Sequence, residues 1–211
     1  MFMKKIFFIP IVFLLLSVAA AFFSGCQTKV DYISRLDQIM SNSQEIEKKW
    51  LIRTSDIPYD LNTVEKYLIE QTYISFSPEI RIRRINDREF HTLAVKANMS
   101  ADGLVRDEFE IDISEDEYLR LFMKKETDAF TIHKTRYQFF DEAIGEIIAI
   151  DIFGNELAGL AYLEIEFANR EEAGKFAEPD WVIMDVTSLK EYKNGSLAKY
   201  GIPVSAMNVN K

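Results

Sequence analysis

Residues 45–52 read Glu-Ile-Glu-Lys-Lys-Trp-Leu-Ile, and this stretch decides the fold. A β-strand points successive side chains to opposite faces, so Glu45, Glu47 and Lys49 share one face. The residues between and beyond them are largely apolar and belong to the other face. The stretch therefore predicts a strand with a charged face that mixes acids and a base.

The same pattern recurs along the chain, at Arg81-Ile82-Arg83, Arg106-Asp107-Glu108-Phe109-Glu110, Lys134-Thr135-Arg136, Glu164-Ile165-Glu166 and, as a lone acid, Ile150-Asp151-Ile152. In an ordinary sheet the charged face would simply be the solvated one, and the spacing alone leaves that alternative open. The recurrence of mixed charges opposite Ile, Val, Leu, Phe and Trp favours a closed sheet turned inside out. Its charged side chains would then point inward, around a polyanion with metal ions.

The spacing of the remaining segments supports this interpretation. About eight or nine consecutive, closely spaced strands favour an antiparallel sheet, and about eight strands closed into a barrel leave a lumen for one small ligand. Helices are expected at 61–70, from a capping box at 114–117, at 170–176 and near 190–199. We predict an α+β fold, an eight-stranded antiparallel β-barrel or tunnel with a charged interior and flanking helices.

The first 26 residues are typical of a secretory signal. Lys4 and Lys5 precede an apolar run, and the segment closes on Phe23-Ser24-Gly25-Cys26, which resembles a bacterial lipoprotein lipobox. We expect lipidation of Cys26 and a membrane-anchored lipoprotein of the bacterial cell envelope, facing outside the cytoplasm. An uncleaved membrane anchor is the alternative. The expected organisation is a signal at 1–26, a tether at 27–43, one domain at 44–202 and a tail at 203–211.

Composition limits the partners. The formal net charge of −9 argues against nucleic acid, which needs a basic surface. It leaves room for a phosphate ligand if the bases are gathered in one place. Cys26 is the one cysteine of the sequence, so its lipidation would leave no thiol for disulfides or thiolate metal sites.

The charged sets suit a buried polyphosphate. Arginine guanidinium groups bind phosphate oxygens in bidentate fashion, and lysines add point charges. The candidates for phosphate binding are Arg81, Arg83, Arg106, Lys134 and Arg136, with Lys49 and Lys96 beside them.

Carboxylates would repel such a ligand unless divalent cations bridged them to it. Mg²⁺ or Mn²⁺ prefers oxygen ligands, typically one or two carboxylates plus phosphate oxygens. The first candidates for metal ligands are Glu45, Glu47 and Glu166, and the further ones are Glu108, Glu110, Glu164 and Asp151. Without metal, crowding so many carboxylates into one lumen is expected to raise some of their pKa values.

These motifs resemble the CYTH, or triphosphate tunnel metalloenzyme, superfamily. Residues 45–49 match its ExExK signature, and the resemblance extends over about residues 44–202. The other matching pieces follow in the family's order: Gln71-Thr72-Tyr73-Ile74, Arg81-Ile82-Arg83, Lys96, Arg106 with Glu108 and Glu110, Lys134-Thr135-Arg136, Asp151, residues 163–167, Val186-Thr187 and residues 192–198.

The resemblance implies a tunnel that binds a triphosphate with divalent metal. It assigns metal binding to Glu45, Glu47 and Glu166, and catalysis to the opening motif, Glu45, Glu47 and Lys49. Phosphate binding falls to Lys49, Arg81, Arg83, Lys96, Arg106, Lys134 and Arg136.

Members of this superfamily include inorganic tripolyphosphatases, thiamine triphosphatases and a class of adenylate cyclases. We therefore expect a divalent-metal-dependent triphosphatase that hydrolyses the terminal phosphate of tripolyphosphate or of a similar organic triphosphate, such as a nucleoside or thiamine triphosphate. A non-catalytic envelope protein that binds polyphosphate is one alternative. A class IV-type adenylate cyclase is another.

Overall fold

The computed structural model describes residues 30–35, 44–86, 90–97, 99–207 and 209. The predicted signal and Cys26 lie outside these residues. Within the described part of the chain, no helix has both the length and the apolar character needed to cross a membrane. Residues 30–35, which belong to the expected tether, form a short helix.

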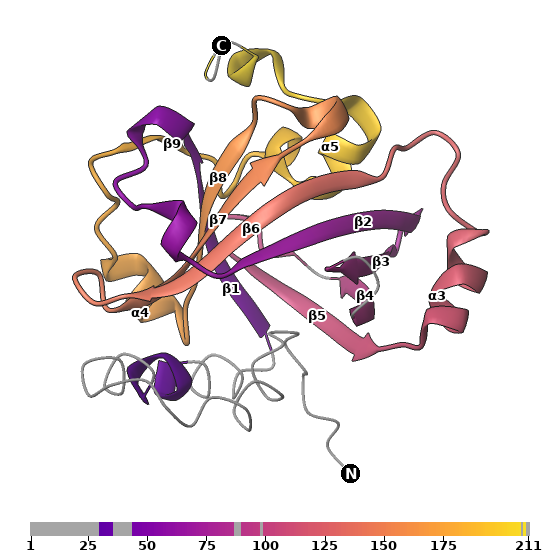
Figure 1. Ribbon diagram of the computed structural model, residues 1–211, viewed down its shortest axis with the longest axis horizontal. Helices are drawn as coiled ribbons and strands as arrows, with labels where there is room; N and C mark the ends of the chain where they lie inside the picture. The colour runs from indigo at the N-terminus through magenta and orange to yellow at the C-terminus, as the bar shows by residue number, and fades with distance from the viewer. Residues whose placement is uncertain (1–29, 36–43, 87–89, 98, 208, 210–211) are drawn as a thin grey trace.

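The core of the molecule is an antiparallel sheet in the order β5-β4-β3-β2-β6-β7-β8-β1-β9 (Figure 1). Its first eight strands close into a barrel because β5 also pairs with β1, which confirms the predicted eight-stranded tunnel. The strands are β1 (Gln44–Ile52), β2 (Lys66–Phe76), β3 (Glu79–Ile85), β4 (Phe90–Ala97), β5 (Val105–Asp112), β6 (Ile132–Asp141), β7 (Glu146–Phe153), β8 (Ala161–Glu166) and β9 (Val182–Asp185).

The barrel is apolar on its outside, as the alternation predicted. Trp50, Ile148 and Leu163 are fully buried, and they pack in one outer cluster with Phe176 and Trp181. These two aromatic residues lie beyond α4 (Arg170–Lys175) and just before β9. Burying an aliphatic or aromatic side chain there stabilises the fold by about 1.5–3 kcal/mol, so the charged faces are left to the lumen.

Short helices connect and cover the strands. Ser114 and Glu117 form the predicted capping box at the start of α3 (Glu115–Phe122). The expected terminal helix is present as a 3₁₀ turn, η4 (Lys190–Tyr192), followed by α5 (Asn194–Tyr200). The other 3₁₀ turns are η1 (Thr54–Asp56), η2 (Leu61–Thr63), η3 (Asn155–Leu157) and η5 (Val204–Ala206).

The prediction of a helix at 61–70 is wrong. Only the turn η2 forms there, and strand β2 begins at Lys66. Strand β2 pairs with β6 on one side and β3 on the other, so its backbone groups are satisfied in the sheet. Tyr67 and Ile69 also alternate into a buried cluster, and this burial outweighs the helical spacing of the apolar residues.

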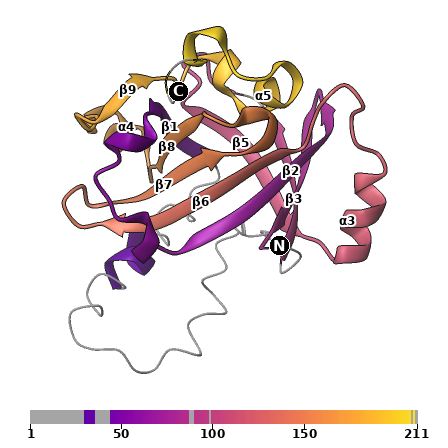
Figure 2. The same cartoon turned by 45° about the horizontal axis from the view of Figure 1, so that its top comes forward.

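The two ends of the barrel differ. At the end drawn uppermost in Figure 1, here the upper end, η4 and α5 cover the opening (Figure 2). Tyr162, Tyr192 and Leu197 are fully buried there, and the Tyr162 hydroxyl donates to the Tyr192 carbonyl at 3.3 Å. The short helix at 30–35 lies below the barrel, at the lower end.

Candidate active site

One cavity in the barrel collects nearly all the residues singled out from the sequence. Asp151 does not line it, and Cys26 lies outside the described residues. The cavity wall includes Glu45, Glu47, Lys49, Arg81, Arg83, Lys96, Arg106, Glu108, Glu110, Lys134, Arg136, Glu164 and Glu166.

Strand register brings these side chains together. Glu47 lies opposite Glu166 and Lys49 opposite Glu164 on the β1–β8 pair. Glu45 lies opposite Arg106 where β1 closes the barrel against β5. Directly opposed residues have Cβ atoms about 4.5–5.5 Å apart, so acids and bases that are distant in the sequence become neighbours.

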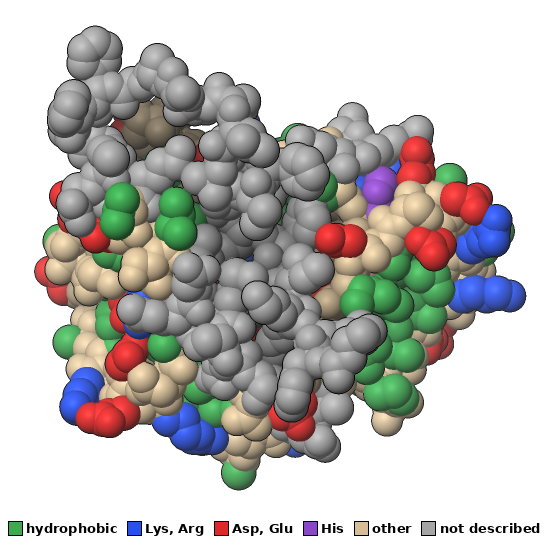
Figure 3. All heavy atoms as spheres, turned by 90° about the horizontal axis from the view of Figure 1, so that it is seen from below, with side chains coloured by type: hydrophobic (Ala, Val, Ile, Leu, Met, Phe, Trp, Pro, Cys, Tyr) green, Lys and Arg blue, Asp and Glu red, His purple; other side chains and the backbone are tan. Residues whose placement is uncertain are grey.

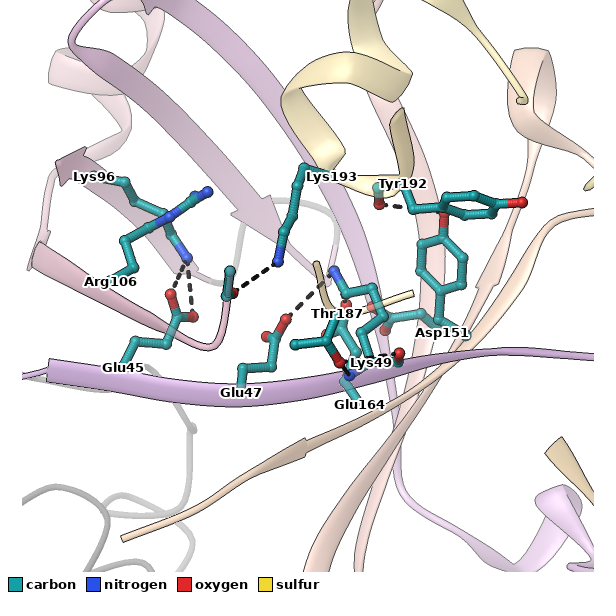
Figure 4. Close-up of polar contacts among 12 residues, drawn as sticks. Glu45, Glu47, Lys49, Lys96, Arg106, Asp151, Glu164, Thr187, Tyr192 and Lys193 are labelled. Atoms are coloured by element: carbon teal, nitrogen blue, oxygen red, sulfur yellow. Dashed lines mark hydrogen bonds and ion pairs between the residues drawn. The ribbon is translucent and has the colours of Figure 1, made fainter. Parts of the chain in front are cut away.

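Two connected groups of salt bridges lie in the lumen, beside the separate pairs Arg83–Glu110 and Arg106–Glu79. In the first, Lys96 Nζ lies 2.6 Å from a Glu45 oxygen (Figure 4). It also lies 3.1 Å from a Glu108 oxygen. Arg81 Nη2 reaches the other Glu108 oxygen at 3.1 Å. These salt bridges connect four strands around the lumen, β1, β3, β4 and β5.

The second group centres on β1, β6 and β8. Lys49 Nζ lies 2.7 Å from Glu164 and 3.4 Å from Glu47. Arg136 contacts Glu164 and also binds Asp151 through two nitrogens, each at 2.7 Å. Asp151 has no exposed surface and pairs with Lys134 as well. It therefore lies behind two cavity bases and offsets part of their positive charge.

The carboxylate pKa values contradict the expectation of a rise for at least two of the acids. Burial alone would raise the pKa of Glu164, but Lys49 and Arg136 outweigh it and lower that pKa well below its usual value. The pKa of Glu108 is also lowered, because Lys96 and Arg81 outweigh burial. For these two acids the neighbouring bases outweigh both crowding and burial. These ion pairs add stability at neutral pH that is lost as the pH falls below the ordinary glutamate value of 4.5.

Two guanidinium groups retain unused donors. The Nε–H groups of Arg81 and Arg83 are buried, and neither has a hydrogen-bond partner among the described residues. Burial and the neighbouring Arg81 lower the pKa of Arg83. A buried donor without an acceptor is costly, about 1–3 kcal/mol, so both side chains suit an anion with several oxygens.

The acids fit a hard divalent cation by their chemistry. Glu45, Glu47 and Glu166 supply only oxygen, and all three reach the same cavity. In the described part of the chain, no three acidic, histidine or cysteine side chains are already grouped closely enough to hold an ion. Glu45 is turned to Lys96 and Glu47 to Lys49, so these carboxylates would have to exchange a base for the metal.

Several residues that line the cavity were not among the predicted site residues, and three of them could take part in binding. Lys193, between η4 and α5, donates to the Gly103 carbonyl at 3.2 Å and lines the cavity from above. Because Lys193 lies outside any strand, the alternation of inward-facing residues along a strand could not identify it. Gln138 and Glu79 also line the cavity. They continue the inward faces of β6 and β3 by two residues, a signal that the sequence did carry.

The face of the molecule seen from below carries charges of both signs. On that face, the blue side chains of the described residues stand among red ones (Figure 3). Among the described residues of this face, acidic and basic side chains are therefore intermixed.

The chain is similar to two characterised bacterial proteins. It is 31% identical over 157 residues to an inorganic triphosphatase of Nitrosomonas europaea, covering 73% of this chain and 96% of that protein. It is 33% identical over 159 residues to an inorganic triphosphatase of Acetivibrio thermocellus, covering 74% and 94%. No protein-family model matches the chain.

Solved structures share the fold. A crystal structure of an inorganic triphosphatase superposes with a TM-score of 0.54 at 26% identity, covering 75% of this chain and 97% of the other. A conserved protein of Pyrococcus furiosus gives a TM-score of 0.51 at 20% identity, covering 66% and 94%, and supports the fold alone.

Proposed function

The chain belongs to the inorganic triphosphatases of the CYTH, or triphosphate tunnel metalloenzyme, superfamily, and on that ground we propose that it hydrolyses the terminal phosphate of inorganic tripolyphosphate. Enzymes of this family depend on a metal ion. For this chain we assign that role to Mg²⁺ or Mn²⁺, because the candidate ligands are all carboxylates.

The observation that carries the proposal is the pair of unused guanidinium donors in a lumen where bases and acids are interleaved. Arg81 and Arg83 point the same way from β3 by the alternation of the strand, and both line the cavity with buried, unpartnered Nε–H groups. A triphosphate presents many oxygens along one short chain. It would satisfy these donors and the nearby bases together.

Lys49 is assigned a fixed positive charge and not the role of a base. Burial would lower its pKa, but Glu164 and Glu47 outweigh burial and raise it above the ordinary lysine value. The ammonium group therefore stays protonated at neutral pH. It is suited to stabilising charge that develops on the transferred phosphate.

Glu45, Glu47 and Glu166 would hold the metal ion. Once bound, such an ion neutralises phosphate charge and acidifies water for attack. Glu45 is paired with Lys96 and Glu47 with Lys49, so phosphates that bind these lysines would free the two carboxylates for the cation. Metal and triphosphate are therefore expected to bind more tightly together than separately. Asp151, buried behind Lys134 and Arg136, is assigned to holding those bases in place and not to the metal.

Phosphate release tests the function directly. The chain is expected to release phosphate from tripolyphosphate with Mg²⁺ or Mn²⁺ and to lose this activity in a chelator. ATP and thiamine triphosphate serve as competing substrates that rank the preference. A cyclic product with pyrophosphate would instead identify a cyclase. Tripolyphosphate that raises the melting temperature without being cleaved would identify a binding protein.

Lys193 gives the activity a dependence on pH. Burial and the nearby charge of Lys49 lower the pKa of Lys193 to about 8. A bound triphosphate favours its charged form, so the contribution to affinity is complete below pH 8 and declines as the pH rises further. The KM for tripolyphosphate is expected to climb above pH 8 in the wild type, because burial lowers the pKa of Lys134 to about 8 as well. In Lys193→Met the KM is expected to be higher at neutral pH and to climb less steeply, since the contribution of Lys134 remains. The same slope in both proteins would remove Lys193 from the binding site. The exposed Lys175→Met is the matched control, since Lys175 pairs only with Glu171 on α4 in the part of the chain that is described.

We also propose that the protein is a lipoprotein of the bacterial cell envelope, lipidated at Cys26. The basic start, the apolar run and the lipobox-like end of residues 1–26 support this. The intact mass of the protein extracted from membranes tests it, because cleavage before Cys26 and acylation change the mass in opposite, calculable ways.

A further inference from the structure

The inward face of β6 carries a line of bases that stops at a neutral residue. Lys134 and Arg136 line the cavity, and Gln138, the next residue on that face, lines it without a charge. Residues two apart on a strand are separated by about 6.6–6.8 Å. Gln138 therefore occupies the place where the line of bases would have continued toward the lower end.

The walls beside Gln138 are apolar. Its register partner on β7 is Ala149, and Ile147 lies one step further on the same face. Tyr67 and Ile85 line the cavity from β2 and β3, and both are buried. A phosphate placed among these side chains would meet no base, only neutral donors such as the Tyr67 hydroxyl, so its loss of water would be poorly compensated.

The short helix at 30–35, here called the cap, holds Gln138 from below. The Gln138 amide Nε2 donates to the Tyr32 hydroxyl at 3.2 Å. Burial, with the nearby Glu65 carboxylate, raises the pKa of Tyr32, so its hydroxyl stays neutral and adds no charge at this end.

Arg35 fixes the cap to the barrel. Its guanidinium group binds both oxygens of Glu146, at 2.6 and 2.7 Å, and reaches Glu172 at 2.5 Å. Glu146 begins β7, and Glu172 belongs to α4. Since Arg35 is only 9% exposed, this clamp is part of the packed structure and not a loose surface contact.

We propose that Gln138, held by the cap, is an end-stop that limits the site to three phosphates. This inference rests on the proposed triphosphatase function and adds to it a substrate length. The line of bases ends where the apolar floor of the lumen begins. A fourth phosphate at that end would meet a neutral amide and Ala149 in place of a base.

Replacing Gln138 with lysine tests the end-stop by extending the line of bases by one step. Tetrapolyphosphate and tripolyphosphate are compared as competing substrates of the full chain, in the same metal and salt. The ratio of their kcat/KM values, tetrapolyphosphate over tripolyphosphate, is expected to rise about tenfold in Gln138→Lys, which corresponds to about 1.4 kcal/mol.

Gln138→Met is the matched control, because it removes the hydrogen bond to Tyr32 without adding charge. Its ratio is expected to stay near that of the wild type. A ratio that rises equally in both variants would mean that loosening the cap, and not the added base, admits the longer chain. That result would overturn the end-stop. So would an unchanged ratio in Gln138→Lys, or a wild-type protein that cleaves both substrates equally well.

Failure of the end-stop can be told apart from failure of the function. Hydrolysis of tripolyphosphate by the wild type tests the function alone. If neither substrate is cleaved, calorimetric dissociation constants for the two ligands give the same ratio, and the same tenfold change in Gln138→Lys is required.

Discussion

Replacing Glu47 with glutamine is expected to lower metal-dependent phosphate release by at least about 100-fold while leaving the barrel folded. A catalytic metal contributes several kcal/mol of charge stabilisation, and each 1.4 kcal/mol is about tenfold in rate. The substitution keeps the size of the side chain and removes one ligand charge. Phosphate release measured across a metal titration should show the loss, and calorimetry should show weaker metal binding.

The fold should tolerate this change. The Glu47 side chain is 25% exposed, and Lys49 keeps its closer partner Glu164 at 2.7 Å. The pair with Glu47, at 3.4 Å, is expected to add less than about 1 kcal/mol to stability. Glu171→Gln, on the exposed face of α4, is the control for losing one surface carboxylate. Full activity and full metal affinity in Glu47→Gln would refute the metal assignment.

Asp151→Asn should produce the largest loss of stability. Asp151 is fully buried and accepts from Lys134 and from two nitrogens of Arg136. Removing one partner of a buried ion pair leaves uncompensated charge and costs about 3–5 kcal/mol. For a domain of this size the thermal midpoint should fall by roughly 6–20 °C.

Ligand rescue separates this explanation from general disruption of the core. Tripolyphosphate offers Lys134 and Arg136 new anionic partners, so it should raise the melting temperature of Asp151→Asn more than that of the wild type. Asp116→Asn breaks an exposed pair with Arg120 on α3 and should change the midpoint little. If Asp151→Asn has the same melting temperature as the wild type, or if tripolyphosphate does not stabilise it more than the wild type, Asp151 does not hold Lys134 and Arg136 in the way described.

The fold could be predicted from the sequence because its signals are local and repeated. A period of two recurs on strand after strand, and only a closed sheet gives so many mixed charged faces a common interior. The prediction of a helix at 61–70 was wrong because its signal is not repeated along the chain. Its apolar spacing is short, and pairing on both edges of β2 decided the outcome.

The site was predictable in composition but not in its pairings. The line of bases Lys134 and Arg136 was evident, yet spacing alone could not show that Asp151 lies behind both of them. The depressed pKa of Glu164 depends on Lys49 and Arg136, which come from two other strands. Lys193 enters from a turn, where no periodicity marks a residue as inward-facing. Such contacts follow from barrel closure, which brings together residues far apart in the sequence.

Strand β1 has a consequence for how the protein is made. It leaves the ribosome first among the strands, yet its contacts lie far along the chain: Gln44 bonds to Asp107 across 63 residues and Lys49 to Thr187 across 138. Closing such long loops is slow, and an unpaired strand is prone to aggregation. Nascent β1 must therefore wait for nearly the whole domain to be synthesised. Its alternating charges, Glu45, Glu47 and Lys49, are of the kind that opposes aggregation, so the residues assigned to catalysis are also expected to protect the strand before the barrel closes.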